Sequence, residues 1–115
     1  MPTADRPVYL RLRDEIVAMI LDGRIQEGDA LPSVRAFAAD QGANPLTVAK
    51  AYQSFQEDGL VTVRRGVGMF VDPGAAARLR ASARAQFLEE EWPEIASRMR
   101  RLGIDPAELL GRVPA

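Results

Sequence analysis

The sequence contains no cysteine and no histidine among its 115 residues. The absence of cysteine excludes a disulfide framework, so nothing in the chain points to export. Without these two residue types the chain also lacks the most common general base, the thiol nucleophile and the standard zinc ligands. Carboxylates remain, but they are scattered among basic residues without an obvious pair. We therefore expect that the protein is not an enzyme and that it uses no metal or other cofactor.

Long apolar runs are also absent. No stretch approaches the roughly 18–20 apolar residues that a membrane-spanning helix needs. Residues Met1–Arg6 lack the charged and then apolar pattern of a signal peptide. We expect a cytoplasmic protein with no membrane partner. Its apolar fraction of 47% and charged fraction of 27% are those of an ordinary folded chain.

The chain has no excess of basic charge, because 16 acidic residues stand against 15 Lys and Arg. Proteins that bind nucleic acids often have a basic balance. Phosphate contacts depend on nearby cations, however, since charges farther away than roughly 10 Å are screened by salt. The location of the basic residues therefore matters more than their total.

Periodicity and capping residues predict two helices in the first third of the chain. Apolar residues recur at helical intervals over about residues 7–22, and Asp5 is expected to cap this helix. A turn-rich connector follows over residues 24–33. Ser33 is then expected to cap a short second helix over about residues 34–41.

A third helix is predicted after a turn of about three residues. Asn44 is its expected N-cap, and Pro45 takes the first helical position, where a missing N–H costs nothing. Gly59 is expected just after its last residue. The apolar spacing predicts a buried stripe made of Val48, Ala51, Tyr52 and Phe55.

A hairpin and a helical tail are predicted for the rest of the chain. Two β-rich runs over residues 60–71 flank a tight turn with Gly66 and Gly68. A fourth helix is expected over about residues 75–91, and Pro93 should cause a kink or a new start. A last short helix should follow the Asp105-Pro106 pair.

This order of elements predicts an α+β fold that is mainly helical. We expect a winged helix-turn-helix domain over residues 1–73 and a short helical dimerisation tail over residues 74–115.

The second and third predicted helices, with Gly42 in the turn between them, fit the geometry of a helix-turn-helix. In that motif the start of the second helix enters the major groove of DNA. At about 100° per residue, Leu46, Lys50 and Gln53 lie opposite the buried stripe, with Thr47 to one side. Any surface helix also has a polar face, so this pattern alone does not separate DNA binding from simple solvent exposure.

Further candidate DNA contacts lie at the helix starts and at the hairpin tip. Asn44 and the first free N–H groups of the third helix are placed to bind a phosphate. Arg64 and Arg65 precede the turn at Gly66, where a wing can approach the backbone or the minor groove. Arg35 would complete the set. Alternatively, these arginines protect an edge hairpin or are solvated surface charges.

Three segments resemble the DNA-binding domain of GntR-type regulators, and together they cover about residues 7–71: Leu31-Pro32-Ser33-Val34-Arg35, Asn44-Pro45-Leu46-Thr47-Val48 and Arg65-Gly66-Val67-Gly68-Met69-Phe70-Val71. The resemblance implies that Arg35 reads bases. It also implies that Asn44, Pro45 and Thr47 meet the DNA at the start of the recognition helix. The wing contact would then come from Arg65 and Gly66.

Two further positions follow from the same resemblance. Lys50 stands where many relatives carry Arg or Lys, and it can reach a phosphate or a guanine edge. Leu46 is less polar than the residue of some family members, which favours contact with a thymine methyl group over a hydrogen bond to a base.

The tail after Pro73 distinguishes between subfamilies. It is too short for the all-helical, lyase-like or aminotransferase-like effector domains of the larger GntR subfamilies. A short two-helix tail is similar to the YtrA subfamily, which implies a homodimer, often encoded beside transporter genes.

The tail also carries more apolar surface than a thin appendage can bury, so a second copy is expected to cover it. The apolar residues concerned are Leu79, Phe87, Leu88, Trp92, Ile95, Met99, Leu102, Ile104, Leu109 and Leu110. Alternatively, the tail folds back on its own domain.

We thus expect a sequence-specific transcription regulator, a repressor by family resemblance, that binds double-stranded DNA at an inverted repeat as a homodimer. A small-molecule effector could change the spacing of the two DNA-binding heads. Arg98, Arg100 and Arg101 would suit an anionic effector between subunits, although a solvated helix face explains them equally well. The alternative function, motivated by the near-neutral charge, is a winged helix that binds a protein partner.

Overall fold

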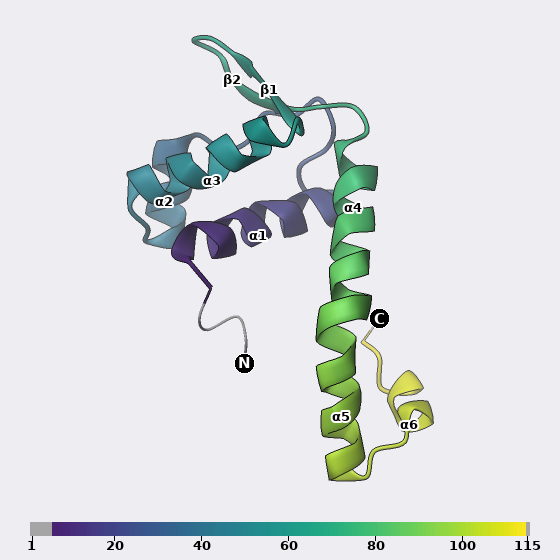
Figure 1. The fold of residues 1–115 in the computed structure, drawn as a ribbon. Helices are drawn as coiled ribbons and strands as arrows, with labels where there is room; N and C mark the ends of the chain where they lie inside the picture. Colours follow the sequence, from purple (N-terminus) through teal and green to yellow (C-terminus); the bar gives the residue numbers. More distant parts are fainter. Residues whose placement is uncertain (1–5, 115) are drawn as a thin grey trace. The chain divides into compact units, whose positions relative to one another are not determined.

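The computed structural model describes residues 6–114 and contains a winged helix-turn-helix followed by further helices (Figure 1). It divides into two compact units, the first ending at Arg80 and the second starting at Ala81. The elements are α1 (Val8–Leu21), α2 (Val34–Gln41), α3 (Pro45–Glu57), β1 (Val61–Arg64), β2 (Gly68–Val71), α4 (Ala75–Gln86), the π-helical turn η2 (Phe87–Glu91), α5 (Trp92–Leu102) and α6 (Pro106–Leu110). The α+β, mainly helical fold class is therefore confirmed.

The starts and ends of α2 and α3 are set by their capping residues. The Ser33 hydroxyl accepts a hydrogen bond from the N–H of Ala36 at 3.1 Å, and Gly42 ends α2 with a φ of 61°. Asn44 then caps α3, where Pro45 occupies the first turn. These short-range contacts supply partners to the first N–H groups of each helix, which the helix itself cannot pair. The predicted bounds of both helices are confirmed.

The first helix starts slightly later than predicted. It begins at Val8, with Pro7 in the N-cap position and no side-chain cap. Asp5, the predicted cap, lies outside the described residues. Leu12, Ile16 and Ile20 form the buried face of α1, as the helical spacing indicates.

One hydrophobic core holds the first unit together. Ile16, Val48 and Phe55 are completely buried at its centre, where α1 and α3 pack against each other. The predicted stripe of α3 is buried in full, and so are Ile25 and Leu31 of the connector. Burial of this apolar surface is the main force that holds α3 in place.

The hairpin is tied to the connector that precedes α2. Strands β1 and β2 pair antiparallel, with Val61 opposite Val71 and Arg64 opposite Gly68. The N–H of Leu31 donates to the carbonyl of Met69 at 2.8 Å, so the connector adds a partial third strand along β2. Backbone hydrogen bonds therefore hold β2 on both of its sides, to β1 and to the connector.

The start of α4 belongs to the first unit, because Ala75 and Leu79 are buried in its core. The compact unit thus extends to Arg80, whereas the sequence placed a domain boundary after residue 73. Arg78 strengthens the attachment. Its guanidinium donates to the carbonyl oxygens of Asp58 at 2.8 Å and Gly59 at 3.0 Å, at the end of α3.

The helix of the second unit is not broken at Pro93. Helical backbone continues through this residue, and η2 ends two residues before it, at Glu91. A proline has no N–H and collides with the carbonyl four residues earlier, and a wider π-helical turn relieves both conflicts. Asp105 and Glu108 form a capping box at the start of α6, as the Asp105-Pro106 pair indicates. None of the helices within residues 6–114 is long and apolar enough to cross a membrane.

Two residues predicted to pack against a second copy are already buried within one chain. Leu79 is 6% exposed in the core of the first unit, and Met99 of α5 is also 6% exposed. Both predictions are corrected, because a buried side chain offers no surface to a partner. The other predicted residues with large exposed apolar surface are Phe87, Leu88, Trp92, Ile95, Leu102, Leu109 and Leu110.

Candidate nucleic-acid interface

The outer face of α3 carries the side chains that the helical spacing placed there. Leu46 is 79% exposed, and Lys50 and Gln53 are exposed as well, whereas Thr47 is half-buried. The buried stripe on the opposite side anchors the helix in the core, so this outer face is held rigidly. A rigid exposed face is what a recognition helix needs to enter the major groove.

The start of α3 differs from the sequence prediction in one respect. The N–H of Leu46 donates to the Asn44 side-chain oxygen at 2.8 Å, and the N–H of Thr47 donates to the Asn44 carbonyl at 3.0 Å. Pro45 has no N–H. The prediction that the first N–H groups of this helix are free for a phosphate is therefore wrong. The Asn44 side-chain NH2 group and the Thr47 hydroxyl remain as polar donors at this end.

Positive charge gathers along the helix-turn-helix and the wing, although the chain as a whole carries a net charge of −1. Residues 30–71 contain four basic residues, Arg35, Lys50, Arg64 and Arg65, and three acidic ones, Asp40, Glu57 and Asp58. The last of these is paired with Arg13. The salt bridges found among the described residues involve other arginines, namely Arg6, Arg13 and Arg24. None of the four cations of the helix-turn-helix and wing has an acidic partner among the described residues, so all four can pair with the phosphates of a polyanion.

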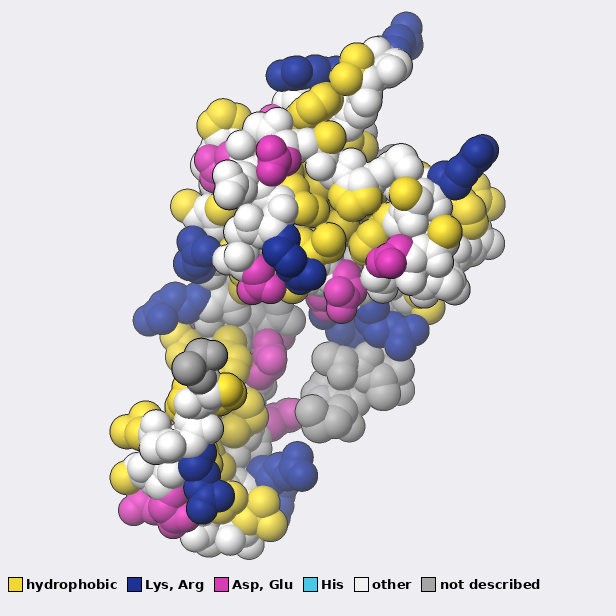
Figure 2. All heavy atoms as spheres, turned by 180° about the vertical axis from the view of Figure 1, so that it is seen from behind, with side chains coloured by type: hydrophobic (Ala, Val, Ile, Leu, Met, Phe, Trp, Pro, Cys, Tyr) yellow, Lys and Arg dark blue, Asp and Glu magenta, His cyan; other side chains and the backbone are white. Residues whose placement is uncertain are grey.

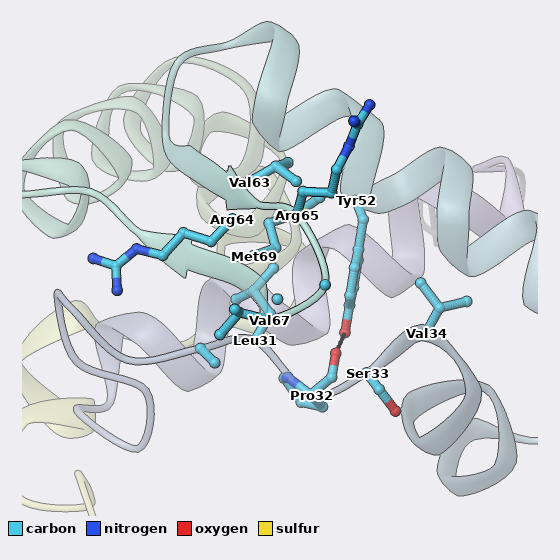
Figure 3. Close-up of a pocket in the computed structure, with 13 residues that line it drawn as sticks. Leu31, Pro32, Ser33, Val34, Tyr52, Val63, Arg64, Arg65, Val67 and Met69 are labelled. Atoms are coloured by element: carbon cyan, nitrogen blue, oxygen red, sulfur yellow. Dashed lines mark hydrogen bonds between the residues drawn. The ribbon is translucent and has the colours of Figure 1, made fainter.

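A groove of about 670 Å³ opens between the hairpin and the connector that leads into α2 (Figure 3). Pro32 and Val34 line one side, and Val63 and Met69 of the hairpin line the other. Tyr52 of α3 crosses between them, and its hydroxyl donates to the Pro32 carbonyl at 2.7 Å. Burial raises the pKa of the Tyr52 phenol to about 12, so this group stays a neutral donor.

The two arginines at the wing tip point away from each other (Figure 3). The Arg64 guanidinium lies 4.4 Å from the centre of the Phe70 ring, which holds this side chain against β2. Arg65 enters the turn that the hydrogen bond from the Val67 N–H to the Arg64 carbonyl closes. Gly66 has a φ of 77°, as this position of a type II turn requires, and no atom lies near the place of a Cβ. The tip therefore offers exposed main chain to a ligand, and Figure 2 shows basic side chains along the same hairpin.

Arg35 and Lys50 differ in how they are held. Arg35, at the second position of α2, is exposed and makes no hydrogen bond or salt bridge with another described residue. The Lys50 ammonium instead lies 4.2 Å from the centre of the Tyr9 ring on α1. No local pattern in the sequence points to a role for Tyr9, because its contact with Lys50 joins residues 41 positions apart.

All the predicted DNA-binding residues lie in the first unit, on α2, on α3 and at the wing. Together they form an exposed recognition helix beside a basic wing, which is the arrangement of a winged DNA-binding domain.

Comparisons with known proteins agree with this class. Residues 8–71 match the family described as "Bacterial regulatory proteins, gntR family". The uncharacterized HTH-type transcriptional regulator YhcF of Bacillus subtilis is 29% identical over 107 residues, which cover 93% of this chain and 87% of the relative. The HTH-type transcriptional repressor YtrA of the same species is 35% identical over 78 residues, 68% of this chain and 60% of the relative.

Solved structures are similar over nearly all of the chain or over part of it. A GntR family transcriptional regulator from Listeria monocytogenes superposes with a TM-score of 0.73 at 27% identity, covering 96% of this chain and 97% of that one. The DNA-binding domain of AraR, solved in complex with operator ORX1, has a TM-score of 0.55 at 27% identity over 57% of this chain and 80% of that one.

This chain belongs to the GntR family of bacterial regulatory proteins. Within that family it is a YtrA-like, DNA-binding transcription regulator, as the resemblance of its motifs and its short helical tail implied.

Proposed function

We propose that this protein is a homodimeric repressor that binds an inverted-repeat operator. The observation that carries the proposal is the group of four cations on α2, α3 and the wing, which have no acidic partner among the described residues although the whole chain is slightly acidic. A relative named as a repressor, YtrA, supports the sign of regulation. A two-fold symmetric dimer would read half-sites about one helical turn apart.

Each DNA contact follows from the position of its side chain. Arg35 is exposed and unpaired among the described residues, so its guanidinium is available for the two acceptors of a guanine edge. Leu46 is the most exposed apolar side chain on α3, which suits contact with a thymine methyl group. Lys50 can reach a phosphate or a guanine from the same face.

The start of α3 and the wing would hold the DNA backbone. The Asn44 side-chain amide, Pro45 and Thr47 lie at the end of the recognition helix that enters the groove in this motif. Arg64, Arg65 and the exposed main chain of Gly66 would approach the minor groove or its phosphates. Such backbone contacts position the protein, while contacts from Arg35 and Leu46 to base edges supply base preference.

The apolar surface of the second unit supports a dimer. Figure 2 shows hydrophobic side chains gathered on this unit. Phe87, Leu88, Trp92 and Ile95 are each between 38% and 45% exposed, and Leu102 and Leu110 more so. Contiguous exposed apolar residues of this kind mark a protein–protein interface. A second copy of the same tail would cover this surface and give the dimer the two-fold symmetry that an inverted-repeat site matches.

The proposed repressor acts in the cytoplasm and responds to a small-molecule effector. The basic residues Arg98, Arg100 and Arg101 at the end of α5 are exposed, and they would suit an anionic effector. Nothing in this arrangement requires a cofactor or catalytic chemistry.

The test starts from an operator that the wild-type protein selects from a random duplex library. Binding to this duplex and to a shuffled one is then measured by fluorescence anisotropy at several salt concentrations. Replacing Arg35 with Ala should weaken selected-duplex binding by about 1–3 kcal/mol and relax base preference. Replacing Arg65 with Ala should weaken both duplexes alike and lower the salt slope by about one.

Arg24→Ala is the matched control, because Arg24 is an exposed arginine paired with Asp22 and lies outside the proposed interface. It should bind like the wild type. A wild-type protein that selects no sequence and shows no salt-dependent binding would refute the proposal and favour a winged helix that binds a protein partner. Wild-type affinity in both arginine variants would refute the residue assignments alone.

A further inference from the structure

The recognition helix is held along one edge by polar side chains of α1. The Lys50 ammonium lies 4.2 Å from the centre of the Tyr9 ring. One helical turn further along both helices, the Arg13 guanidinium donates to the Ser54 hydroxyl at 2.7 Å. Arg13 also lies 4.5 Å from the Phe55 ring centre and forms a salt bridge with Asp58 at 2.9 Å. We call this row of contacts the α1–α3 seam.

The two ends of the seam differ in charge. Asp58 neutralises Arg13, which is therefore a structural group. Tyr9 provides an aromatic face instead of a carboxylate, so it holds the Lys50 ammonium without placing a negative charge beside it. Lys50 is also one turn after Leu46 on the exposed face of α3, the helix that enters the major groove in this motif.

We propose that Tyr9 is a positioning residue for DNA recognition: its ring orders the Lys50 side chain before DNA arrives. A free lysine side chain loses much rotamer freedom when its ammonium is fixed on a phosphate or a base. The contact with Tyr9 already restricts the Lys50 side chain in the unbound protein. Less conformational entropy is then lost on binding, so binding becomes tighter. The inference rests on the proposed function, because Lys50 must contact DNA for its order to matter.

A ring that competes with DNA for the Lys50 ammonium would have the opposite effect on affinity. If the Tyr9 ring held Lys50 away from the DNA, the ammonium would have to leave the ring on binding. Removing the ring would then strengthen binding instead of weakening it. The sign of one measurement therefore separates a positioning ring from a competing one.

The experiment is a double-mutant cycle with Tyr9→Leu, Lys50→Met and the double variant, measured by anisotropy on the selected duplex. Tyr9→Phe is the matched control, because it keeps the ring and loses the hydroxyl. We expect Tyr9→Leu to weaken binding about two- to five-fold, the range of an exposed cation–π contact. Tyr9→Phe should bind like the wild type, and Tyr9→Leu should have no effect in the Lys50→Met background.

NMR of the DNA-free proteins supplies a reading that a general loss of structure would not produce. The Lys50 side-chain protons should be shifted upfield by the ring in the wild type and in Tyr9→Phe, and this shift should vanish in Tyr9→Leu, while core resonances stay unchanged. Additive effects of the two substitutions, or tighter binding by Tyr9→Leu, would overturn the role of Tyr9 while leaving the proposed function intact. A wild-type protein without sequence preference would overturn both.

Discussion

Replacing Tyr52 with phenylalanine removes one oxygen atom from the first unit and should lower its stability by a predictable amount. The hydroxyl donates to the Pro32 carbonyl at 2.7 Å, and the Tyr52 side chain is 3% exposed. A hydrogen bond of this kind contributes about 0.5–1.5 kcal/mol to the free energy of unfolding. For a unit of this size, a loss of about 1 kcal/mol lowers the Tm by about 4–8 °C. Thermal denaturation followed by circular dichroism measures this difference.

The same substitution tests the pKa of the Tyr52 phenol, which burial raises from 10.0 to about 12. Between these two values the unfolded chain releases the phenolic proton and the folded chain keeps it. The unfolded state then binds fewer protons, so the stability of the wild type falls as the pH rises through this window. The phenyl ring of the variant cannot titrate. The stability advantage of the wild type should therefore be constant at neutral pH and should shrink between about pH 10 and pH 12.

Comparing the two proteins at each pH cancels the titration of all other groups. A Tm difference that stays constant up to about pH 12 would refute the buried, neutral phenol. Equal Tm values at neutral pH would refute the contribution of the hydrogen bond to Pro32.

Two further predictions concern the attachment of α4 and the exposed face of the second unit. Arg78→Met keeps most of the side-chain stem but removes both hydrogen bonds to the end of α3, so the free energy of unfolding should fall by about 1 kcal/mol. Arg80→Met removes a single long bond of 3.4 Å and should cost less, and equal losses in chemical denaturation would contradict the role of Arg78. Leu110→Lys places a charge on a side chain that is 77% exposed in the single chain, so the fold should persist while sedimentation velocity reports a weakened dimer. Val67→Lys, at a 72% exposed apolar residue of the wing, is the matched control and should leave the dimer unchanged.

The charge pattern explains why total composition is a weak guide to the partner of this protein. The net charge of −1 gives no indication of a polyanion. The positive charge becomes apparent only when Arg35, Lys50, Arg64 and Arg65 are placed on adjoining elements of one unit. Screening limits each charge to its surroundings, so this local surplus determines which ligand can bind.

Local signals in the sequence were sufficient to predict the helices and the hairpin of the first unit. Ser33 and Asn44 cap their helices through atoms two or three residues away, and Gly42 and Gly66 supply the positive φ that each turn needs. The apolar spacing of α3 likewise defined its buried and exposed faces. These features depend on near neighbours in the chain, so they can be predicted without any knowledge of the tertiary structure.

The tertiary structure establishes which side chains far apart in the sequence contact each other. It placed Lys50 over Tyr9, joined the Tyr52 hydroxyl to Pro32, and buried Leu79 in the first unit instead of leaving it for a dimer contact. Residue spacing predicts which face of a helix is apolar, but not which neighbour covers it, because that depends on how all the elements pack together.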